Sequence, residues 1–174
     1  MLPPDRTGEF YVSSYNGDEV VVYDASGAHI RSFTAEGLNG PRGIVILDDG
    51  TMYVASQLSD EVYVFDANEQ PVTSFGHAAL DGPTGMALRA DGLLYVSSWV
   101  TDSIVVFELD GTYLRSFTGG GLNGPNCVAF DSEANIYVAS ALTASVLKFN
   151  PDEQFMFGFT GGGLSSPMLS LIHI

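Results

Sequence analysis

A sequence repeat of about 42 residues is the feature that most constrains the fold of this chain. The stretch GPRGIVILDDGTMYVAS begins at Gly40, and close copies of it begin at Gly82 and Gly124. Other landmarks keep the same spacing: the Tyr-Val pairs at 11, 53, 95 and 137, the phenylalanines at 33, 75, 117 and 159, and the leucines at 38, 80, 122 and 164. Because several landmarks share one period, the sequence predicts a series of similar structural units that stack side by side.

Each unit is expected to contain four short strands. In the unit that begins at Gly40 they span 43–47, 52–56, 61–66 and 72–75, and the Asp49-Gly50 pair favours a tight hairpin turn between the first two. The third strands are nearly continuous apolar runs, such as Val-Tyr-Val-Phe at 62–65. Such runs of β-branched and aromatic residues indicate strands that are covered on both faces. The sequence contains no convincing helical stripe of apolar residues.

An all-β chain of this kind is predicted to be a β-propeller of four-stranded antiparallel blades. A β-solenoid is the alternative, but its coils are usually shorter. The blades are assigned to residues 40–81, 82–123 and 124–165, and they are preceded by an incomplete blade in residues 1–39 that holds the second to fourth strands. Residues 166–174 are either the start of a truncated blade or an artefactual tail.

The repeat resembles NHL repeats over about residues 8–165. The residues that carry the resemblance are Gly-Pro-x-Gly, then Asp-Gly, Tyr-Val-x-Ser, Val-x-Val-Phe-Asp and Ser-Phe, in that order. The resemblance implies a propeller, commonly of six blades, of a kind that occurs in ubiquitin-ligase adaptors, RNA-binding regulators, bacterial receptor ectodomains and some lyases. Gluconolactonase-like enzymes share the architecture. The fold alone therefore does not define the activity.

About four blades are present where six are implied, so the chain is expected to form an open arc. An open arc would expose the apolar faces of its two end blades, which favours self-association. The alternative is a closed four-bladed ring in which residues 168–174 supply the strand that is missing from the first blade.

The charge of the chain argues against several classes of partner. The formal net charge is −15, from 21 acidic and 6 basic residues, and Lys148 is the only lysine. Because nucleic-acid binding needs basic side chains, no nucleic acid is expected as a partner. No apolar run approaches the roughly 18 residues of a membrane span, so no membrane insertion is expected. The first residues lack the features of a signal peptide, which indicates a cytoplasmic chain if the N-terminus is genuine and an extracellular one if a signal peptide is missing.

Strand parity places the loops between second and third strands on the same side of the molecule as the crossings between blades. We call this side the crossing-loop face; the Asp-Gly hairpins lie on the opposite side. Equivalent positions on the crossing-loop face differ from blade to blade, which is typical of a binding surface on a rigid scaffold. The candidate binding residues there are Tyr15, Arg42, Gln57, Trp99, Asn123 and Asn126.

Two of these residues have alternative interpretations. Trp99, the only tryptophan, is either an exposed anchor for a partner or a cover over the neighbouring blade. Arg42 either meets a carboxylate or phosphate of a ligand or pairs with Asp81 or Asp18, and the surrounding acid favours the pairing.

No catalytic residue, metal ligand or cofactor is predicted. The aspartates at 18, 60 and 102 recur at one loop position on separate blades, as turn-forming residues do, so they are expected to cap the loops. The serines at 14, 56, 98 and 140 recur in every blade, which indicates loop hydrogen bonding rather than a nucleophile. Cys127 stands where the sister repeats have glycine and is expected to be a small buried residue.

The sequence therefore predicts a non-catalytic binding or scaffold module that engages a protein, a peptide or a small polar ligand on the crossing-loop face. The alternative is a metal-dependent lyase or lactonase-like propeller enzyme whose site lies partly in missing blades. The first interpretation is favoured because the sequence shows no histidine or acidic set with metal-ligand spacing.

Overall fold

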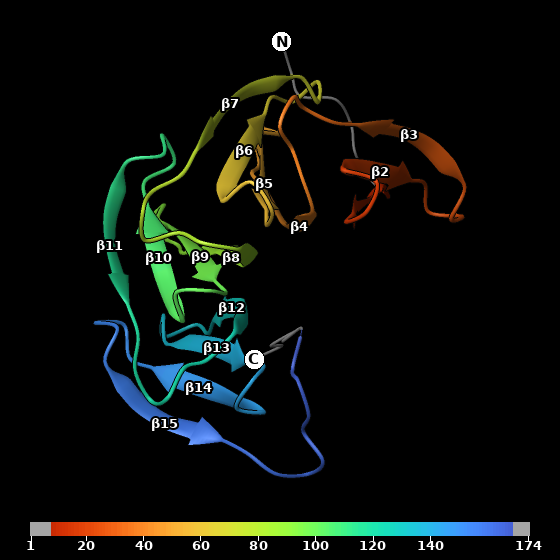
Figure 1. Cartoon of the computed structure of the whole chain (residues 1–174). Coiled ribbons are helices and arrows are strands. Elements are labelled where there is room, and N and C mark those ends of the chain that lie inside the picture. The colour runs from red at the N-terminus through yellow and green to blue at the C-terminus, as the bar shows by residue number, and fades with distance from the viewer. Residues whose placement is uncertain (1–7, 169–174) are drawn as a thin grey trace.

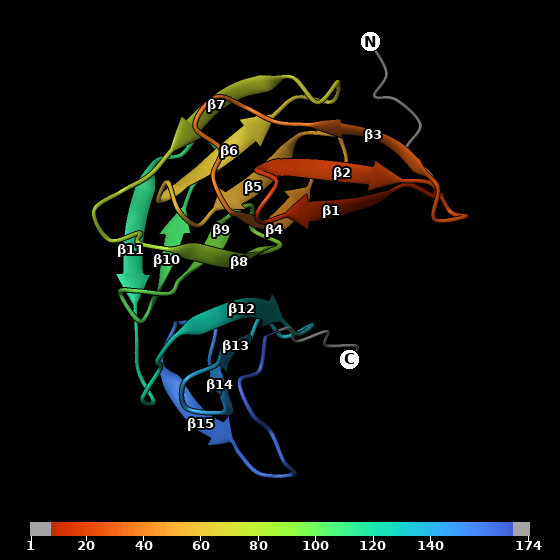
Figure 2. The same cartoon turned by 45° about the vertical axis from the view of Figure 1, so that its right-hand side comes forward.

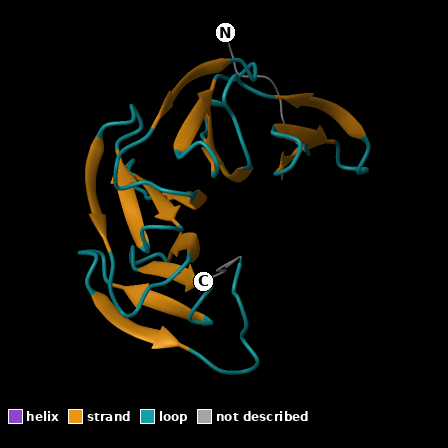
Figure 3. Ribbon diagram, viewed as in Figure 1, coloured by secondary structure: helices purple, strands orange, loops and turns teal. Residues whose placement is uncertain are grey.

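The structure, a computed structural model, describes residues 8–168, and every regular element in this range is a strand (Figures 1 and 3). The alternatives for residues 166–174, a truncated blade or an artefactual tail, and the closed ring completed by residues 168–174 concern a segment of which residues 169–174 lie outside the described residues. The strands are β1 (Phe10–Ser14), β2 (Glu19–Tyr23), β3 (His29–Phe33), β4 (Pro41–Ile46), β5 (Met52–Ser56), β6 (Glu61–Phe65), β7 (Pro71–Phe75), β8 (Pro83–Leu88), β9 (Leu94–Ser98), β10 (Ser103–Phe107), β11 (Tyr113–Phe117), β12 (Pro125–Phe130), β13 (Ile136–Ser140), β14 (Ser145–Phe149) and β15 (Phe155–Phe159).

The strands form four antiparallel sheets, which we call blades 1 to 4 in chain order. Blade 1 has the order β1-β2-β3, and blades 2, 3 and 4 hold β4 to β7, β8 to β11 and β12 to β15. Figure 1 shows the blades fanned in an open arc, with β4, β8 and β12 on its inner side and β7, β11 and β15 on its outer side. Figure 2 shows the same succession of twisted sheets from another side. The predicted all-β propeller arc is confirmed.

The strand bounds follow the predicted ones closely. The second strand of blade 2 spans the predicted residues, and the first begins two residues early, at Pro41. A proline fits there because the first residue of a strand can lack a ladder N–H. The hairpin at Asp49-Gly50 is a three-residue loop: the Gly50 N–H donates to Leu47 at 2.9 Å, and Gly50 has a φ of 87°. The glycine supplies the left-handed residue that this loop type needs.

Apolar side chains fill the space between consecutive blades, which we call a seam. Strands β5, β9 and β10 are buried along their whole length, as expected for strands covered on both faces. One aromatic pair of the same kind recurs in each seam: Phe33–Phe65, Phe75–Phe107 and Phe117–Phe149, with ring centroids 5.0, 5.1 and 5.3 Å apart. The three seams therefore share one packing plan, which the sequence repeat encodes.

The innermost strands pack so closely that two positions must be glycine. A Cβ on Gly43 would lie 2.6 Å from the Thr84 carbonyl oxygen, and a Cβ on Gly85 would lie 2.5 Å from that of Asn126. The repeat has Cys127 at the third such position, where it is half-buried rather than buried as expected. The glycines thus set the approach of one blade to the next.

An aspartate in each of the first three blades ties that blade to the next one. Asp18, Asp60 and Asp102 all have positive φ, and each accepts a hydrogen bond from a glycine N–H of the following crossing. The three bonds run from Gly40, Gly82 and Gly124 at 2.8, 2.8 and 2.7 Å. The predicted structural role of these carboxylates is confirmed. Each carboxylate caps a backbone N–H of the crossing that leads into the next blade.

Removing one of these caps should destabilise the chain measurably. The N–H of buried Gly82 has the Asp60 carboxylate as its partner, so Asp60→Ala is expected to lower the free energy of unfolding by about 1–3 kcal/mol. Asp60→Asn is the matched control, because asparagine keeps an acceptor oxygen and tolerates the left-handed backbone. Urea unfolding of both variants tests this. Equal losses would contradict the assigned role of the carboxylate oxygen.

A polar cluster closes the outer side of two seams. In the seam between blades 3 and 4, Arg115 donates to Glu153 through Nε at 2.9 Å and Nη2 at 2.6 Å, and the Tyr95 hydroxyl donates to Glu153 at 2.8 Å. In the seam between blades 1 and 2, Arg31 donates to Glu69 in the same way. Burial and the neighbouring Glu153 carboxylate together raise the pKa of Tyr95 above its usual value of 10.0.

This shift predicts a loss of stability at alkaline pH. The neutral phenol is favoured in the folded state, so its contribution is complete below the unfolded pKa near 10 and is lost as pH rises through the raised folded pKa. The melting temperature should therefore fall more steeply above about pH 10 in the parent chain than in Tyr95→Phe. Calorimetry between about pH 8 and about pH 11 measures this. Parallel pH profiles for the two proteins would contradict it.

Candidate functional site

The loops between second and third strands lie against the crossings, as strand parity predicts. In blade 2 the N–H groups of Gln57 and Leu58 donate to the carbonyls of Gly40 and Asn39, each at 3.0 Å. The same pair of bonds joins loop and crossing in blades 3 and 4, at Trp99, Val100, Ala141 and Leu142. The crossing-loop face is therefore a continuous surface built from these two kinds of segment.

In blades 2, 3 and 4 a serine fixes the loop between second and third strands to the crossing. The Ser56 hydroxyl accepts from the Asn39 N–H at 2.8 Å and donates to the Asn39 carbonyl at 3.0 Å, and the Ser59 hydroxyl lies 2.6 Å away. Ser98 and Ser140 make the equivalent bonds in blades 3 and 4. These hydroxyls are occupied by the backbone, which agrees with their predicted role in loop hydrogen bonding.

Three predicted site residues meet on the crossing-loop face. The Arg42 guanidinium lies over the Tyr15 ring, 4.7 Å from its centroid, and the Arg42 Nε donates to Gln57 Oε1. The predicted pairing of Arg42 with Asp81 or Asp18 is wrong. The ion pairs among residues 8–168 involve Arg31, Arg89, Arg115 and Lys148 instead. Tyr15 and Gln57 are the nearer partners, because both loop tips lean over the crossing that carries Arg42.

The structure combines both interpretations of Trp99. Its indole carbon Cη2 lies 3.1 Å from the position a Cβ of Gly124 would take, so it covers the crossing of the neighbouring blade. The side chain remains half-exposed and borders a shallow hollow with Gln57 and Asp81. Exposed apolar side chains flank this hollow at the loop tips, namely Leu58 and Val100, which are 57% and 60% exposed. A partner could therefore contact Trp99 together with apolar neighbours.

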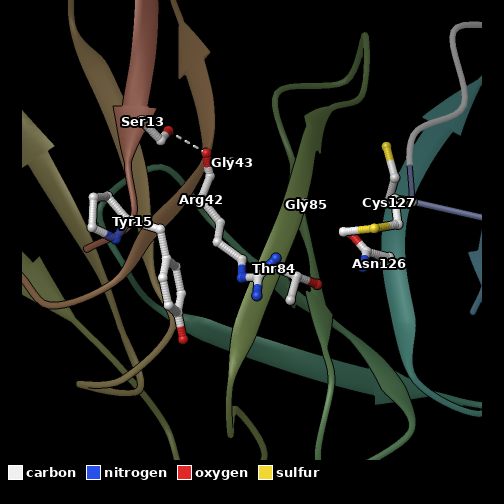
Figure 4. A pocket seen from close by; sticks show the side chains of 10 residues that line it. Ser13, Tyr15, Arg42, Gly43, Thr84, Gly85, Asn126 and Cys127 are labelled. Carbon is white, nitrogen blue, oxygen red and sulfur yellow. Dashed lines mark hydrogen bonds between the residues drawn. The ribbon is translucent and has the colours of Figure 1, made fainter. Parts of the chain in front are cut away.

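A second hollow of about 320 Å³ lies between the inner ends of the blades (Figure 4). Tyr15 and Arg42 line it together with Thr84, which lies beside the Arg42 guanidinium in Figure 4, and Asn126 and Cys127 line the far side. The side chain of Asn126 makes no hydrogen bond to another residue of the described range, although the residue is only 9% exposed. The Thr84 hydroxyl donates to the Pro125 carbonyl at 2.9 Å and is thereby held in place.

Three of the candidate binding residues, Tyr15, Arg42 and Asn126, line this hollow. Arg42 and Asn126 occupy one repeat position on different blades, and strand parity placed both on this face. Ser13 and Cys127 also line the hollow and were not predicted as site residues; their signal is the variation among positions 13, 55, 97 and 139 and among 43, 85 and 127. Asn123 is exposed and lines neither hollow, and its backbone N–H is bonded to Ser140.

Acidic and metal-binding groups are sparse around the two hollows. Asp60 and Asp81 border the shallow hollow, and Asp60 accepts from the Gly82 N–H. Within residues 8–168, no group of three or more histidine, cysteine, aspartate or glutamate side chains is placed to hold a metal ion. No helix in that range is long and apolar enough to cross a membrane. The two hollows thus combine an arginine with aromatic, amide and hydroxyl groups and, in the shallow hollow, with the carboxylates of Asp60 and Asp81.

Comparison with protein families decides the classification. The family described as SMP-30/gluconolactonase/LRE-like region matches residues 5–142. The chain belongs to this family. The match names the gluconolactonase-like group rather than NHL repeats, so the narrower resemblance to NHL repeats stays a prediction. A search of curated proteins gives no match.

Solved structures of similar fold agree with this family. A streptogramin B lyase has a TM-score of 0.79 at 12% identity, over 94% of this chain and 55% of that one. A virginiamycin B lyase from Staphylococcus aureus has a TM-score of 0.74 at 12% identity, over 91% and 58%. A chain of a nidogen/laminin complex has a TM-score of 0.80 at 19% identity, over 92% and 62%. This family member thus spans little more than half the length of these chains, and the likeness shows the fold.

Proposed function

We propose that the chain is a binding module whose crossing-loop face holds a ligand by a carboxylate group. The observation that carries the proposal is Arg42, whose guanidinium lies at a hollow without a carboxylate partner among the described residues, in a chain of net charge −15. Arg42 lines the shallow hollow together with Asp60 and Asp81 but forms an ion pair with neither of them. Arg42 is instead held by the Tyr15 ring and the Gln57 amide.

The two terminal amino groups of the Arg42 guanidinium are available to a ligand. Gln57 takes the Nε–H, and neither terminal amino group of the guanidinium bonds to another residue within 8–168. A guanidinium presents paired donors that match a carboxylate, so a bidentate contact is available. The Asn126 amide across the hollow supplies a further donor and acceptor for hydroxyl or amide groups of the ligand.

Two kinds of ligand carry a carboxylate that could bind Arg42 in this way. One is a small polyhydroxy acid inside the hollow of about 320 Å³, and the other is the C-terminus of a peptide. A peptide would also contact Trp99, Leu58 and Val100, which lie exposed or half-exposed at the neighbouring loop tips. The nidogen/laminin complex offers a precedent for a chain of this fold in a protein assembly.

Calorimetric titration tests the proposal with defined probes. Gluconate, sorbitol, and one short peptide with a free or an amidated C-terminus distinguish the carboxylate from the rest of each ligand. We expect a carboxylate probe to bind, its neutral counterpart to bind at least tenfold more weakly, and Arg42→Gln to lose the difference. Arg89→Gln is the matched control, because Arg89 pairs with Asp91 at the opposite hairpins. Loss of peptide binding alone in Trp99→Ala identifies the peptide source. Equal binding by Arg42→Gln and the parent, or no binding of any probe, overturns the proposal.

Membership of the gluconolactonase-like family and the two lyase structures favour a second candidate, an enzyme that uses a divalent metal. Its metal would need ligands beyond the acidic and histidine groups that the described residues bring together. The discriminating measurement is thermal unfolding with added calcium, magnesium or zinc, followed by a lactone-hydrolysis assay. A clear rise in melting temperature together with turnover favours the enzyme, and no response to any metal favours the binding module.

A further inference from the structure

The three seams are of two kinds. In seams 1/2 and 3/4, an arginine on one blade meets a glutamate in a hairpin loop of the next, as Arg31 meets Glu69 and Arg115 meets Glu153. Both glutamates have positive φ, 63° and 64°. We call these the ion-paired seams. Seam 2/3 lacks the ion pair, because Thr73 and Gly111 stand at the equivalent positions.

Seam 2/3 is closed by apolar packing instead, and we call it the apolar seam. Phe75 lies so close to Gly111 that a Cβ there would be 2.7 Å from the Phe75 ring. The Tyr53 hydroxyl donates to the Leu109 carbonyl at 2.9 Å, in place of the tyrosine–glutamate bond of the other seams. The kinds alternate, so the chain has a second period of twice the repeat length, visible as Arg31 to Arg115 and Glu69 to Glu153.

The two end faces of the arc continue this alternation. The face of blade 4 that points away from blade 3 carries Phe157 where the ion-paired seams have arginine, beside Phe159. The face of blade 1 that points away from blade 2 carries Gly27 where those seams have glutamate, with a φ of 83°. Phe159 and Gly27 stand at the repeat positions of Phe75 and Gly111, which pack together in the apolar seam, and Phe157 stands at the position of Thr73. The two end faces therefore match each other and do not match the ion-paired seams.

Both end faces expose apolar side chains whose counterparts in the interior seams are buried. Phe10 and Val12 on blade 1 are 58% and 47% exposed, whereas their counterparts in blades 2, 3 and 4 are fully buried in seams: Met52, Leu94, Ile136, Val54, Val96 and Val138. On blade 4, Phe157 and Phe159 are 46% and 44% exposed. Contiguous apolar surface of this kind marks an interaction site.

One charged residue on the blade 4 face is already satisfied. Lys148 stands where blade 2 has Val64, but its ammonium lies 3.7 Å from Asp131 and 5.1 Å from the centroid of the Tyr137 ring. Its charge is therefore balanced within blade 4, and the ring faces of Tyr137 and Phe157 flank it. The face can be covered without leaving that ammonium unpaired.

We propose that copies of this chain associate head to tail, with blade 4 of one copy against blade 1 of the next, through a seam of the apolar kind. The occupant is a second copy because the chain itself carries both halves of that seam, and seam 2/3 shows how they fit. The contact joins two different faces, so it is heterologous and leaves one further face free at each end. The assembly should therefore grow with concentration rather than stop at a symmetric dimer. This proposal uses other residues than the ligand proposal and is independent of it.

Sedimentation velocity over a range of concentrations tests the association. The parent chain should move reversibly from its monomer mass of 18.5 kDa to more than twice that mass as its concentration rises. Phe157→Arg and Gly27→Glu should each abolish the association, since each puts one unpaired charge into an apolar seam. Val72→Arg is the matched control: it places the same charge on the outer strand of an interior blade, at a residue that is 64% exposed, and should associate like the parent.

Mixing the two variants tests the pairing of the faces. Phe157→Arg in one chain and Gly27→Glu in the other recreate the arginine–glutamate pair of the ion-paired seams, so the mixture should regain the larger species that neither variant forms alone. Circular dichroism of each variant confirms that it is folded before mixing. A monomeric parent chain, variants that associate like the parent, or a mixture that stays monomeric each overturns the proposal.

Discussion

Replacing Phe107 with alanine is expected to lower the free energy of unfolding by about 3–5 kcal/mol, the largest effect of any substitution considered. Phe107 is fully buried in the apolar seam, where its ring lies 5.1 Å from Phe75 and 6.1 Å from Tyr113. The alanine variant loses the transfer free energy of the ring and leaves a cavity between two sheets that can collapse only by moving a whole blade. Chemical unfolding followed by far-ultraviolet circular dichroism measures the loss.

The repeat supplies its own control for this prediction. Tyr23 stands at the equivalent position of blade 1, on the face that points away from blade 2, and it is only half-buried. Tyr23→Ala should therefore cost about 1 kcal/mol, mainly through weaker strand propensity. If Tyr23→Ala were as destabilising as Phe107→Ala, stability would not depend on packing in the seams, and the description of the core would be wrong.

Gly85→Ala is expected to cost about 3 kcal/mol, although it adds a single methyl group. The new Cβ would lie 2.5 Å from the Asn126 carbonyl oxygen and 2.7 Å from the Cys127 Cα. Both neighbours are backbone atoms of the next blade, so no side chain can rotate away to make room. The two innermost strands must separate, and this loosens the seam along its length.

Cys127 provides the comparison for Gly85, because it occupies the same repeat position in blade 4. Cys127→Ala keeps a Cβ where one is already present, and its cost should stay within about 1 kcal/mol. Thermal unfolding of both variants gives the contrast. A Gly85→Ala protein as stable as the parent would mean that the blades approach one another less closely than the structure shows.

Much of the architecture was predictable because it repeats. The second strand of blade 2, Met52–Ser56, has its predicted bounds, and the pairing of loops with crossings followed from strand parity alone. The recurrence of aspartate at 18, 60 and 102 predicts a structural role, and the hydrogen bonds of these carboxylates agree with it. Where one residue type returns at one position, a shared structural requirement is the simplest cause.

The candidate site was less predictable because it lies where the repeat varies. The partners of Arg42 depend on how Tyr15 and Gln57 lean over the crossing, and neither sequence spacing nor net charge specifies that. The excess of acid pointed to an ion pair with Asp81 or Asp18, whereas the structure shows an aromatic and an amide partner. Local geometry decides which of several nearby groups an arginine meets.

The alternation of seams was present in the sequence but has a different period. Arg31 and Arg115 lie two repeat lengths apart, as do Glu69 and Glu153, so a comparison of adjacent repeats shows them only as mismatches. Their meaning depends on the pairing of residues from consecutive blades, which the fold reveals. In this chain, the residues that recur at twice the repeat length therefore distinguish the blade faces that form ion-paired seams from those that form the apolar seam.

If stability resides in the seams between stacked blades, native-state hydrogen exchange should differ sharply between interior and terminal strands. We expect the slowest exchange in β9 and β10, which are buried along their length between two neighbouring blades, and much faster exchange in β1 and β15 at the two ends of the arc. Amides of β1 or β15 that exchange as slowly as those of β9 would contradict it.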